Sequence, residues 1–257
     1  MKQRMTLLVC GGTGCMASES QEMLDQLKAK VNELNMQDEI KVIKTGCFGF
    51  CGQGPIIKVQ PENVFYVKVK LSDIDDIFEE HILKGRVVER LLFVDPKKQE
   101  PIKEHKDMDF YKKQMRIALR NCGFINPEDI GEYIAVKGYE ALAIVLSENT
   151  PKEVIQIMKD SKLRGRGGGG FPTGLKWELT AKHRRQDKYV ICNADEGDPG
   201  AFMDRSILEG DPHSVIEAMA IAGYAMGANT GMVYIRAEYP LAIHRLEVAL
   251  EQAREYG

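Results

Sequence analysis

Two pairs of cysteines constrain the fold of this 257-residue chain more than any other feature of its sequence. Cys10 and Cys15 form a C-x4-C pair, and Cys47 and Cys51 form a C-x3-C pair. Each pair lies in a glycine-rich loop at the end of an expected strand. An iron–sulfur cluster requires four thiolates, and its sulfides accept hydrogen bonds from the backbone N–H groups that such loops expose. The two pairs together therefore predict a cluster-binding site.

Two other interpretations of these cysteines remain open from the residues alone. Zinc also binds four cysteines, although usually through more tightly spaced C-x2-C pairs. The cysteines could instead be four buried thiols without a ligand, but such thiols are usually scattered rather than paired in loops. The remaining cysteines, Cys122 and Cys192, have no close partner in the sequence and are expected to be small packing residues.

The spacing of apolar residues in the first ninety positions predicts the element order β-α-β-β-β-α, which is typical of a thioredoxin-like α/β sandwich. A capping box of Ser18 and Gln21 is expected to start the first helix. The expected elements cover residues 6–9, 18–34, 40–45, 55–59, 64–67 and 72–85.

Roughly residues 4–90 resemble the thioredoxin-like [2Fe-2S] ferredoxin family, which has the same C-x4-C and C-x3-C pattern. The resemblance implies that Cys10, Cys15, Cys47 and Cys51 are the metal ligands of a [2Fe-2S] cluster. The charged and proline-punctuated segment that follows is expected to be a linker, and a helix is expected over residues 110–120. The predicted domains are residues 1–94, a linker at 95–108 and a second domain at 109–257.

A glycine-rich stretch dominates the second half of the chain, where residues 163–177 read LRGRGGGGFPTGLKW. Glycines let backbone amides approach a ligand and form an anion cradle, and the arginine and lysine side chains supply charge for phosphates. Phe171 and Trp177 offer flat surfaces for a ring. This combination predicts a phosphorylated aromatic ligand, such as a flavin or a nicotinamide nucleotide, while a flexible loop is the alternative.

A second loop rich in acids follows an expected buried strand at residues 189–192. Ligands bind at the carboxyl ends of parallel strands, which is where Asn193, Asp195 and Asp198 would lie. The alternative is a solvated acidic turn. A further strand at residues 232–236 and intervening helices predict a β-α-β-α order with a parallel sheet.

The stretches LRGRGGGGFPTGLKWE and ICNADEGDPGAFMDR resemble the family of flavin- and NADH-binding subunits of respiratory NADH dehydrogenase. Its soluble relatives include NAD(P)-linked, often electron-bifurcating, iron-only hydrogenases and NAD-dependent formate dehydrogenases. An N-terminal [2Fe-2S] domain on the same chain makes the hydrogenase beta subunit the nearest type. The resemblance implies a partial parallel-sheet FMN/NAD-binding domain, truncated at its C-terminal end.

The same resemblance assigns residues to the cofactors. Phe171 would stack on the adenine of the nucleotide, while Asp198 and Leu179 differ from the glutamate and phenylalanine that relatives have there. No side-chain acid or base is required, so no catalytic residue is named. The implied cofactor-binding residues are Gly165, Arg166, Gly167, Gly168, Gly170, Phe171, Gly174, Lys176, Asn193, Asp195, Glu196 and Asp198.

Together these features predict an electron-transfer flavoprotein subunit that moves electrons between NAD(H) or NADP(H) and iron–sulfur clusters through FMN. The expected partners are a hydrogenase or formate dehydrogenase catalytic subunit, a small thioredoxin-like [2Fe-2S] subunit and a ferredoxin. A subunit of NADH-quinone oxidoreductase, or a [2Fe-2S] relay module without NADH activity, is the alternative. A [4Fe-4S] cluster is expected only in a C-terminal part that this sequence lacks.

Composition adds the expected location of the protein. The short apolar run after Met1 is interrupted by Cys10, which argues against a signal peptide, and no apolar run reaches the ~18 residues of a membrane span. We therefore expect a cytoplasmic protein, in which structural disulfides are rare. The net charge of −3 and the lack of a basic stripe argue against nucleic acid as a partner.

Overall fold

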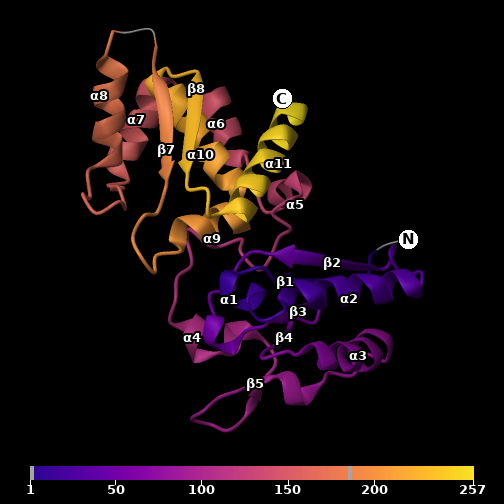
Figure 1. Cartoon of the computed structure of the whole chain (residues 1–257). Helices are drawn as coiled ribbons and strands as arrows, with labels where there is room; N and C mark the ends of the chain where they lie inside the picture. The colour runs from indigo at the N-terminus through magenta and orange to yellow at the C-terminus, as the bar shows by residue number, and fades with distance from the viewer. Residues whose placement is uncertain (1–2, 185–186) are drawn as a thin grey trace. The chain divides into compact units, whose positions relative to one another are not determined.

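The computed structural model describes residues 3–184 and 187–257, and the chain divides into two compact units after Asn126. Figure 1 shows the elements of both units, which are described separately below. No helix in the described ranges is long and apolar enough to cross a membrane.

The first unit is built on a four-stranded sheet with the order β2-β1-β3-β4. Strands β1 and β2 are parallel, while β3 runs antiparallel to both β1 and β4. This arrangement confirms the predicted thioredoxin-like α/β sandwich. The elements are β1 (Met5–Cys10), α1 (Thr13–Met16), α2 (Ser20–Glu33), β2 (Ile40–Thr45), η1 (Cys51–Gln53), β3 (Ile57–Gln60), β4 (Val64–Tyr66), η2 (Leu71–Asp73), α3 (Ile74–Asp76), η3 (Ile77–Leu83) and η4 (Glu89–Leu91).

One detail of the first helix differs from the sequence prediction. Helix α2 begins at Ser20, and its N-cap residue Glu19 has a left-handed backbone with a φ of 67° and makes no side-chain cap. The Ser20 hydroxyl instead donates a hydrogen bond to the carbonyl of Cys10 at 2.9 Å. The helix start is thus fastened to the end of β1 rather than closed by the expected Ser18–Gln21 capping box.

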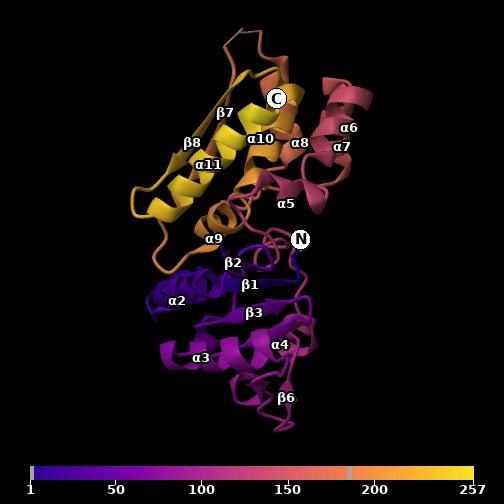
Figure 2. The same cartoon turned by 90° about the vertical axis from the view of Figure 1, so that its right-hand side faces the viewer.

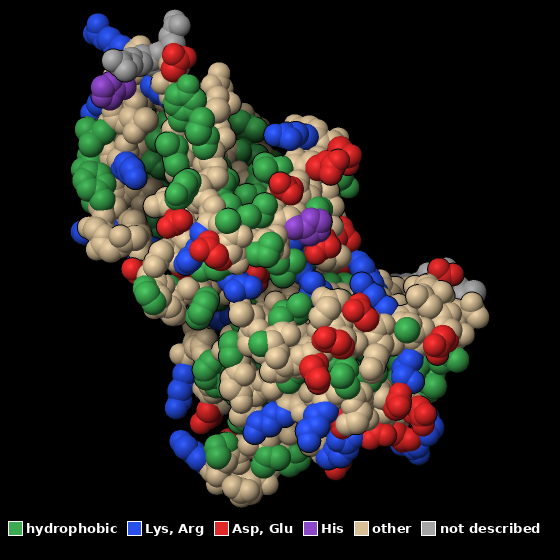
Figure 3. All heavy atoms as spheres, viewed as in Figure 1, with side chains coloured by type: hydrophobic (Ala, Val, Ile, Leu, Met, Phe, Trp, Pro, Cys, Tyr) green, Lys and Arg blue, Asp and Glu red, His purple; other side chains and the backbone are tan. Residues whose placement is uncertain are grey.

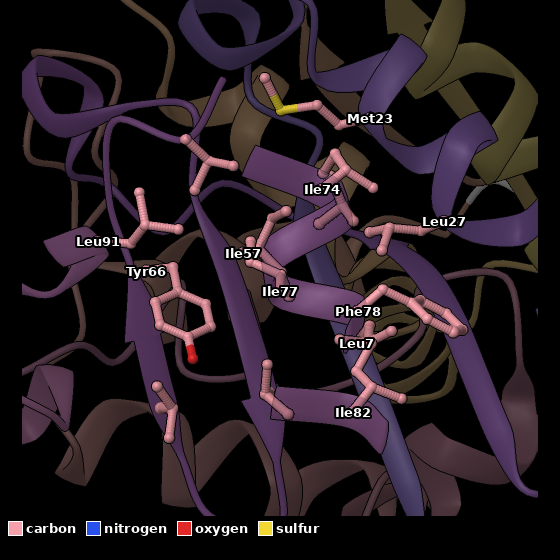
Figure 4. Packing of buried hydrophobic residues seen from close by; sticks show 14 of the residues in the cluster. Leu7, Met23, Leu27, Ile57, Tyr66, Ile74, Ile77, Phe78, Ile82 and Leu91 are labelled. Carbon is pink, nitrogen blue, oxygen red and sulfur yellow. The ribbon is translucent and has the colours of Figure 1, made fainter. Parts of the chain in front are cut away.

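Alternation along the strands sends side chains to both faces of this sheet. Leu7 of β1 and Ile57 of β3 pack against Met23 and Leu27 of α2 on one face, and all are buried. Figure 4 shows this core, to which the helical stretch η2–η3 adds Ile74, Ile77, Phe78 and Ile82.

The opposite face of the sheet is covered by the segment predicted to be a linker and by the residues that follow it. The segment is joined to the edge strand β4, where Phe65 donates its backbone N–H to the carbonyl of Lys103 at 2.9 Å. Val64 of the same strand forms an isolated antiparallel β-bridge with Glu104. Met108 is fully buried in the core on this face. Residues in the expected linker at 95–108 therefore pack against the sheet. The physical reason is that a strand with apolar residues on both faces requires cover on both. This layer holds β5 (Phe93–Val94), β6 (Pro101–Ile102), η5 (His105–Asp107) and α4 (Asp109–Lys112).

The helix expected over residues 110–120 is wrong, since only the single turn α4 forms there. Packing of Tyr111, rather than an amphipathic helix face, holds this stretch against the sheet.

The second unit has two parallel strands, β7 and β8, with helices between and after them, as the β-α-β-α prediction required. Helix α10 packs against both strands, and Figure 2 shows α10 and α11 on the same side of the strand pair. The elements are α5 (Ile130–Ala135), α6 (Glu140–Glu148), α7 (Pro151–Asp160), α8 (Thr173–Lys182), β7 (Tyr189–Ala194), α9 (Met203–Gly210), α10 (Pro212–Met226), β8 (Thr230–Ile235) and α11 (Pro240–Tyr256).

The other face of the β7–β8 pair is open, which corrects the expectation of a buried strand at residues 189–192. Ile191 is 66% exposed and Tyr234 is 63% exposed. Figure 3 shows hydrophobic side chains gathered over these strands. Only one face of a two-stranded sheet is covered here, so alternate apolar residues remain in solvent.

Candidate functional sites

The two cysteine pairs meet because β1 and β2 are adjacent parallel strands. Cys10 is the last residue of β1 and is in register with Thr45, the last residue of β2. Cys15 lies in α1, directly after the first loop, while Cys47 follows β2 and Cys51 begins η1. The carboxyl ends of the two strands thus present both loops at one edge of the sheet.

Two glycines let the backbone of these loops pass close to the cysteine sulfurs. A Cβ at Gly12 would lie 2.8 Å from the sulfur of Cys47 and 3.5 Å from that of Cys10. A Cβ at Gly54 would lie 2.6 Å from the sulfur of Cys15. Gly12 lies inside the C-x4-C pair and Gly54 lies three residues after the C-x3-C pair. Their place beside the cysteines was the signal that could have marked them as part of the site.

Hydrogen bonds within and between the two cysteine pairs shift the pKa values of these thiols in different directions. A hydrogen bond with Cys15 is the main cause that raises the pKa of Cys10 to about 12, and the same bond lowers the pKa of Cys15. A hydrogen bond with Cys10 raises the pKa of Cys47, and burial raises that of Cys51. This group of thiols would release protons on binding a metal, because cysteine binds a metal as the thiolate.

The donor set fits a two-iron cluster. A zinc site needs three or four ligands at one ion, whereas a [2Fe-2S] cluster divides four ligands between two irons. The two pairs of convergent thiols match the four-thiolate donor set of such a cluster.

The glycine-rich stretch of the second unit connects α7 to α8, and backbone hydrogen bonds join the two ends of this loop. The N–H of Gly165 donates to the carbonyl of Phe171, and the N–H of Thr173 donates to the carbonyl of Leu163, both at 2.9 Å. Upstream, the predicted start of α7 is confirmed, since Thr150 and Glu153 form a reciprocal capping box. The loop is therefore ordered at both ends, which disfavours the flexible-loop alternative.

The tip of this loop offers free backbone donors. A Cβ at any of Gly167–Gly170 would meet nothing within 4 Å, and Gly168 has a φ of +92° that favours glycine. Within the described ranges, none of these four residues donates its N–H in a backbone hydrogen bond. The side chains of Arg166 and Lys176 are exposed and make no hydrogen bond or ion pair in the same ranges. Amides and cations are thus available to an anion.

Gly174, which the resemblance placed in the cofactor loop, has a packing role in this structure. It is buried at the crossing of α7 and α8, where a Cβ would lie 2.5 Å from the backbone nitrogen of Lys159. We expect Gly174→Ala to destabilise the second unit by about 1–3 kcal/mol through overpacking. Chemical denaturation measures this, and Gly169→Ala, which has open space around it, is the matched control. Equal stability of the two variants would contradict the packing role.

Glu196 makes hydrogen bonds that hold the acidic loop after β7 in place. Its carboxylate accepts the backbone N–H groups of Asp204 at 2.9 Å and Arg205 at 3.1 Å, so it caps the first turn of α9. Its carbonyl accepts a hydrogen bond from Arg236 at 3.0 Å. The backbone of Glu196 has a φ of 47°, a strained value that these contacts hold in place.

The remaining acidic-loop residues keep free polar atoms. Within residues 3–184 and 187–257, the side-chain oxygen of Asn193 accepts only the N–H of Asp195, at 3.3 Å, and Asn193 is exposed. Asp198 is also exposed, and its carbonyl accepts the N–H of Ala201. A cavity of about 550 Å³ lies elsewhere in this unit and contains none of the predicted site residues; it is lined mainly by Ile216, Met219, Val233, Leu246 and Leu250.

Comparison with known proteins identifies both units. Residues 1–81 match the thioredoxin-like [2Fe-2S] ferredoxin family, and residues 158–257 match the Nuo51 FMN-binding domain family. The two stretches are thus similar to a thioredoxin-like [2Fe-2S] ferredoxin and to a Nuo51-type FMN-binding domain, which confirms the resemblances stated above.

Its curated relatives are components of redox complexes. It is 66% identical over 57% of its length to the NADP-reducing hydrogenase subunit HndC of Solidesulfovibrio fructosivorans, covering 29% of that protein. It is 50% identical over 55% of its length to an NADH-quinone oxidoreductase subunit of Rhizobium meliloti, covering 34% of it. The chain thus spans about a third of the length of these relatives.

A solved structure also aligns with part of the chain. The thioredoxin-like [2Fe-2S] ferredoxin from Aquifex aeolicus aligns with 36% of this chain and 99% of its own, at 28% identity and a TM-score of 0.33.

Proposed function

We propose that this chain belongs to a multi-subunit, NAD(P)-linked hydrogenase and passes electrons between a pyridine nucleotide and iron–sulfur clusters through FMN. The observation that carries the proposal is the presence, in one chain, of four convergent thiols and a glycine loop with unused amides and cations. The 66% identity to HndC, a hydrogenase component, favours this complex over a formate dehydrogenase or a quinone-linked one.

Bound FMN supplies the conversion between two-electron and one-electron transfer, and the cluster supplies one-electron transfer. The protein's part is to bind and orient these groups. The amides of Gly167–Gly170 donate to phosphate, and Arg166 and Lys176 balance its charge. The exposed ring of Phe171 offers a stacking surface for adenine.

The acidic loop forms the second part of the proposed FMN site. Asn193, Asp195 and Asp198 present oxygens that can accept hydrogen bonds from the hydroxyls of a ribityl chain. Glu196 remains a predicted cofactor residue, and its contacts with α9 also set the course of the loop. In the first unit, the four cysteines would hold the [2Fe-2S] cluster.

The proposal is tested with the purified complex that contains this chain. We expect bound FMN, iron and acid-labile sulfide, and reduction of a viologen dye by NADH or NADPH. Co-purification of a hydrogenase catalytic subunit is the expected result for the partner. If the cluster is reduced by that partner but never by a pyridine nucleotide, the chain is a relay module and the flavin part of the proposal is lost.

We expect the charge-neutral variants Arg166→Gln and Lys176→Gln each to weaken FMN binding at least about tenfold, since a charge-assisted bond to phosphate contributes about 1.5–3 kcal/mol. Quenching of FMN fluorescence measures the affinity in the complex. Lys152→Gln, an exposed lysine at the start of α7, is the matched control and should bind FMN as the unmodified protein does. Equal affinities for all four proteins would remove these side chains from the site.

Electron bifurcation is the finer part of the proposal. A bifurcating complex would produce hydrogen only when NAD(P)H and reduced ferredoxin are supplied together. Hydrogen production from NADPH alone would reject bifurcation while leaving the electron-transfer role intact.

A further inference from the structure

The segment that covers the second face of the ferredoxin-like sheet also touches the loop of the C-x3-C pair. Its relevant part, residues 108–125, lies between the two stretches that match known families, at residues 1–81 and 158–257. Nothing in those matches assigns it a role. Two of its side chains bond to carbonyls of the cysteine loop.

The first contact joins Tyr111 to the peptide group between Phe48 and Gly49. The buried hydroxyl of Tyr111 donates to the Phe48 carbonyl at 2.9 Å. The N–H of the same peptide group belongs to Gly49, and it donates to the sulfur of Cys47 at 3.3 Å. Tyr111 therefore binds one end of a peptide dipole whose other end points at a ligand sulfur.

The second contact repeats this geometry one residue earlier. The half-buried guanidinium of Arg116 donates to the Cys47 carbonyl at 3.4 Å. The N–H of that peptide group belongs to Phe48, and this N–H acts to lower the pKa of the Cys10 thiol, so it faces a second ligand sulfur. Arg116 thus binds the far end of the peptide whose N–H faces this sulfur.

Further contacts hold the segment in this position. The Thr45 hydroxyl donates to the carbonyl of Ile125 at 3.0 Å and accepts the N–H of Gly123 at 3.2 Å. The ring of Phe48 lies against Gly123 so closely that a Cβ there would clash with it. The segment and the cysteine loop are therefore fixed to one another on both sides of the two peptide groups.

We infer that Tyr111 and Arg116 are positioning residues that orient and polarise two peptide groups whose N–H bonds to Cys47 and Cys10 raise the reduction potential of the [2Fe-2S] cluster. Hydrogen bonds in a chain polarise one another, so a donor at the carbonyl strengthens the N–H bond to sulfur. Bonds to cluster sulfurs stabilise the more negative, reduced state. The charge of Arg116 acts in the same direction. The inference rests on the cluster of the proposed function.

The test is a redox titration of the complete chain, reconstituted anaerobically with iron and sulfide and followed by electron paramagnetic resonance of the reduced cluster. Tyr111→Phe and Arg116→Gln should each lower the reduced-to-oxidised ratio at a fixed potential about threefold, equivalent to about 30 mV at 59 mV per tenfold change. Arg116→Lys keeps the charge and should recover part of that shift.

Two controls separate this effect from a general loss of stability. Tyr66→Phe removes a buried hydroxyl that bonds to His81 at 2.8 Å on the opposite face of the sheet. Arg120→Gln removes an exposed arginine from the covering segment. Both controls should keep the midpoint potential of the unmodified chain.

The outcomes distinguish the inference from the proposed function. Iron and sulfide in the unmodified chain, with unchanged midpoints for Tyr111→Phe and Arg116→Gln, would overturn the inference alone. A chain that binds no iron and sulfide under these conditions would overturn both. If Tyr111→Phe loses its cluster too fast to titrate, the midpoint of Arg116→Gln decides the result.

Discussion

Replacing Gly12 by alanine is expected to reduce the cluster content of the reconstituted chain at least about tenfold, an effect that about 1.4 kcal/mol of strain is enough to produce. The added Cβ would lie 2.8 Å from the Cys47 sulfur and 3.5 Å from the Cys10 sulfur. The backbone of Gly12 is extended, with a φ of −66°, so alanine fits it without strain. The expected loss therefore comes from contact with Cys47, whose sulfur would have to move, because 3.5 Å to the Cys10 sulfur is ordinary van der Waals contact.

Gly14 provides the matched control in the same loop. A Cβ there would lie 3.6 Å from the Cβ of Cys51, which is ordinary van der Waals contact. Because Gly14 lies within α1, alanine should also favour the helix. Iron and sulfide analysis, together with visible absorbance, measures the cluster in both variants. Equal cluster content in Gly12→Ala and Gly14→Ala would show that the loops do not close on the ligands as described.

The second large effect is expected at Glu217, a buried carboxylate of α10. It accepts hydrogen bonds from the Tyr133 hydroxyl at 2.6 Å and from the backbone N–H groups of Tyr139 and Leu142 at 3.0 and 3.1 Å. Glu217→Ala would leave these three donors without their acceptor in a buried site. We expect a loss of about 3 kcal/mol in the free energy of unfolding of the second unit.

The only tryptophan of the chain reports on this unit. Trp177 packs against Val154, Ile155 and Ala225, so its fluorescence in a urea titration follows unfolding of the second unit alone. Glu251→Ala, at an exposed position of α11, is the control and should change stability by less than about 0.5 kcal/mol. A loss below about 1 kcal/mol for Glu217→Ala would mean that water replaces the carboxylate at low cost.

Much of the fold was predictable because its signals are local. Alternation of apolar residues marked the strands, and proline with Thr150 and Glu153 marked the start of α7. Loop chemistry was local as well, since the four cysteines and the glycines lie next to one another in short motifs. The expected ligand classes followed from those motifs, and both family matches lie where the motifs are.

Errors arose where packing decided the outcome. A charged, proline-punctuated composition suggested a linker, yet the sheet needed a second covering layer, and Phe93, Ile102, Met108 and Tyr111 contribute to it. The apolar strand β7 was expected to be buried, but its partners in the described ranges cover one face only. Neither result can be obtained from periodicity, because periodicity says which side chains share a face and not what lies against it.

The sequence by itself determined the donor types: four thiols, a run of glycines with cations, and an acidic loop after a strand. Only the tertiary structure decided which groups act on them. Tyr111 is 63 residues from the carbonyl that it binds, and no local pattern links it to the cysteines. The same is true of Glu217, which holds a segment more than seventy residues away. Covalent spacing fixes chemistry within a motif, whereas contacts between distant segments depend on how the sheet and its covering layers pack.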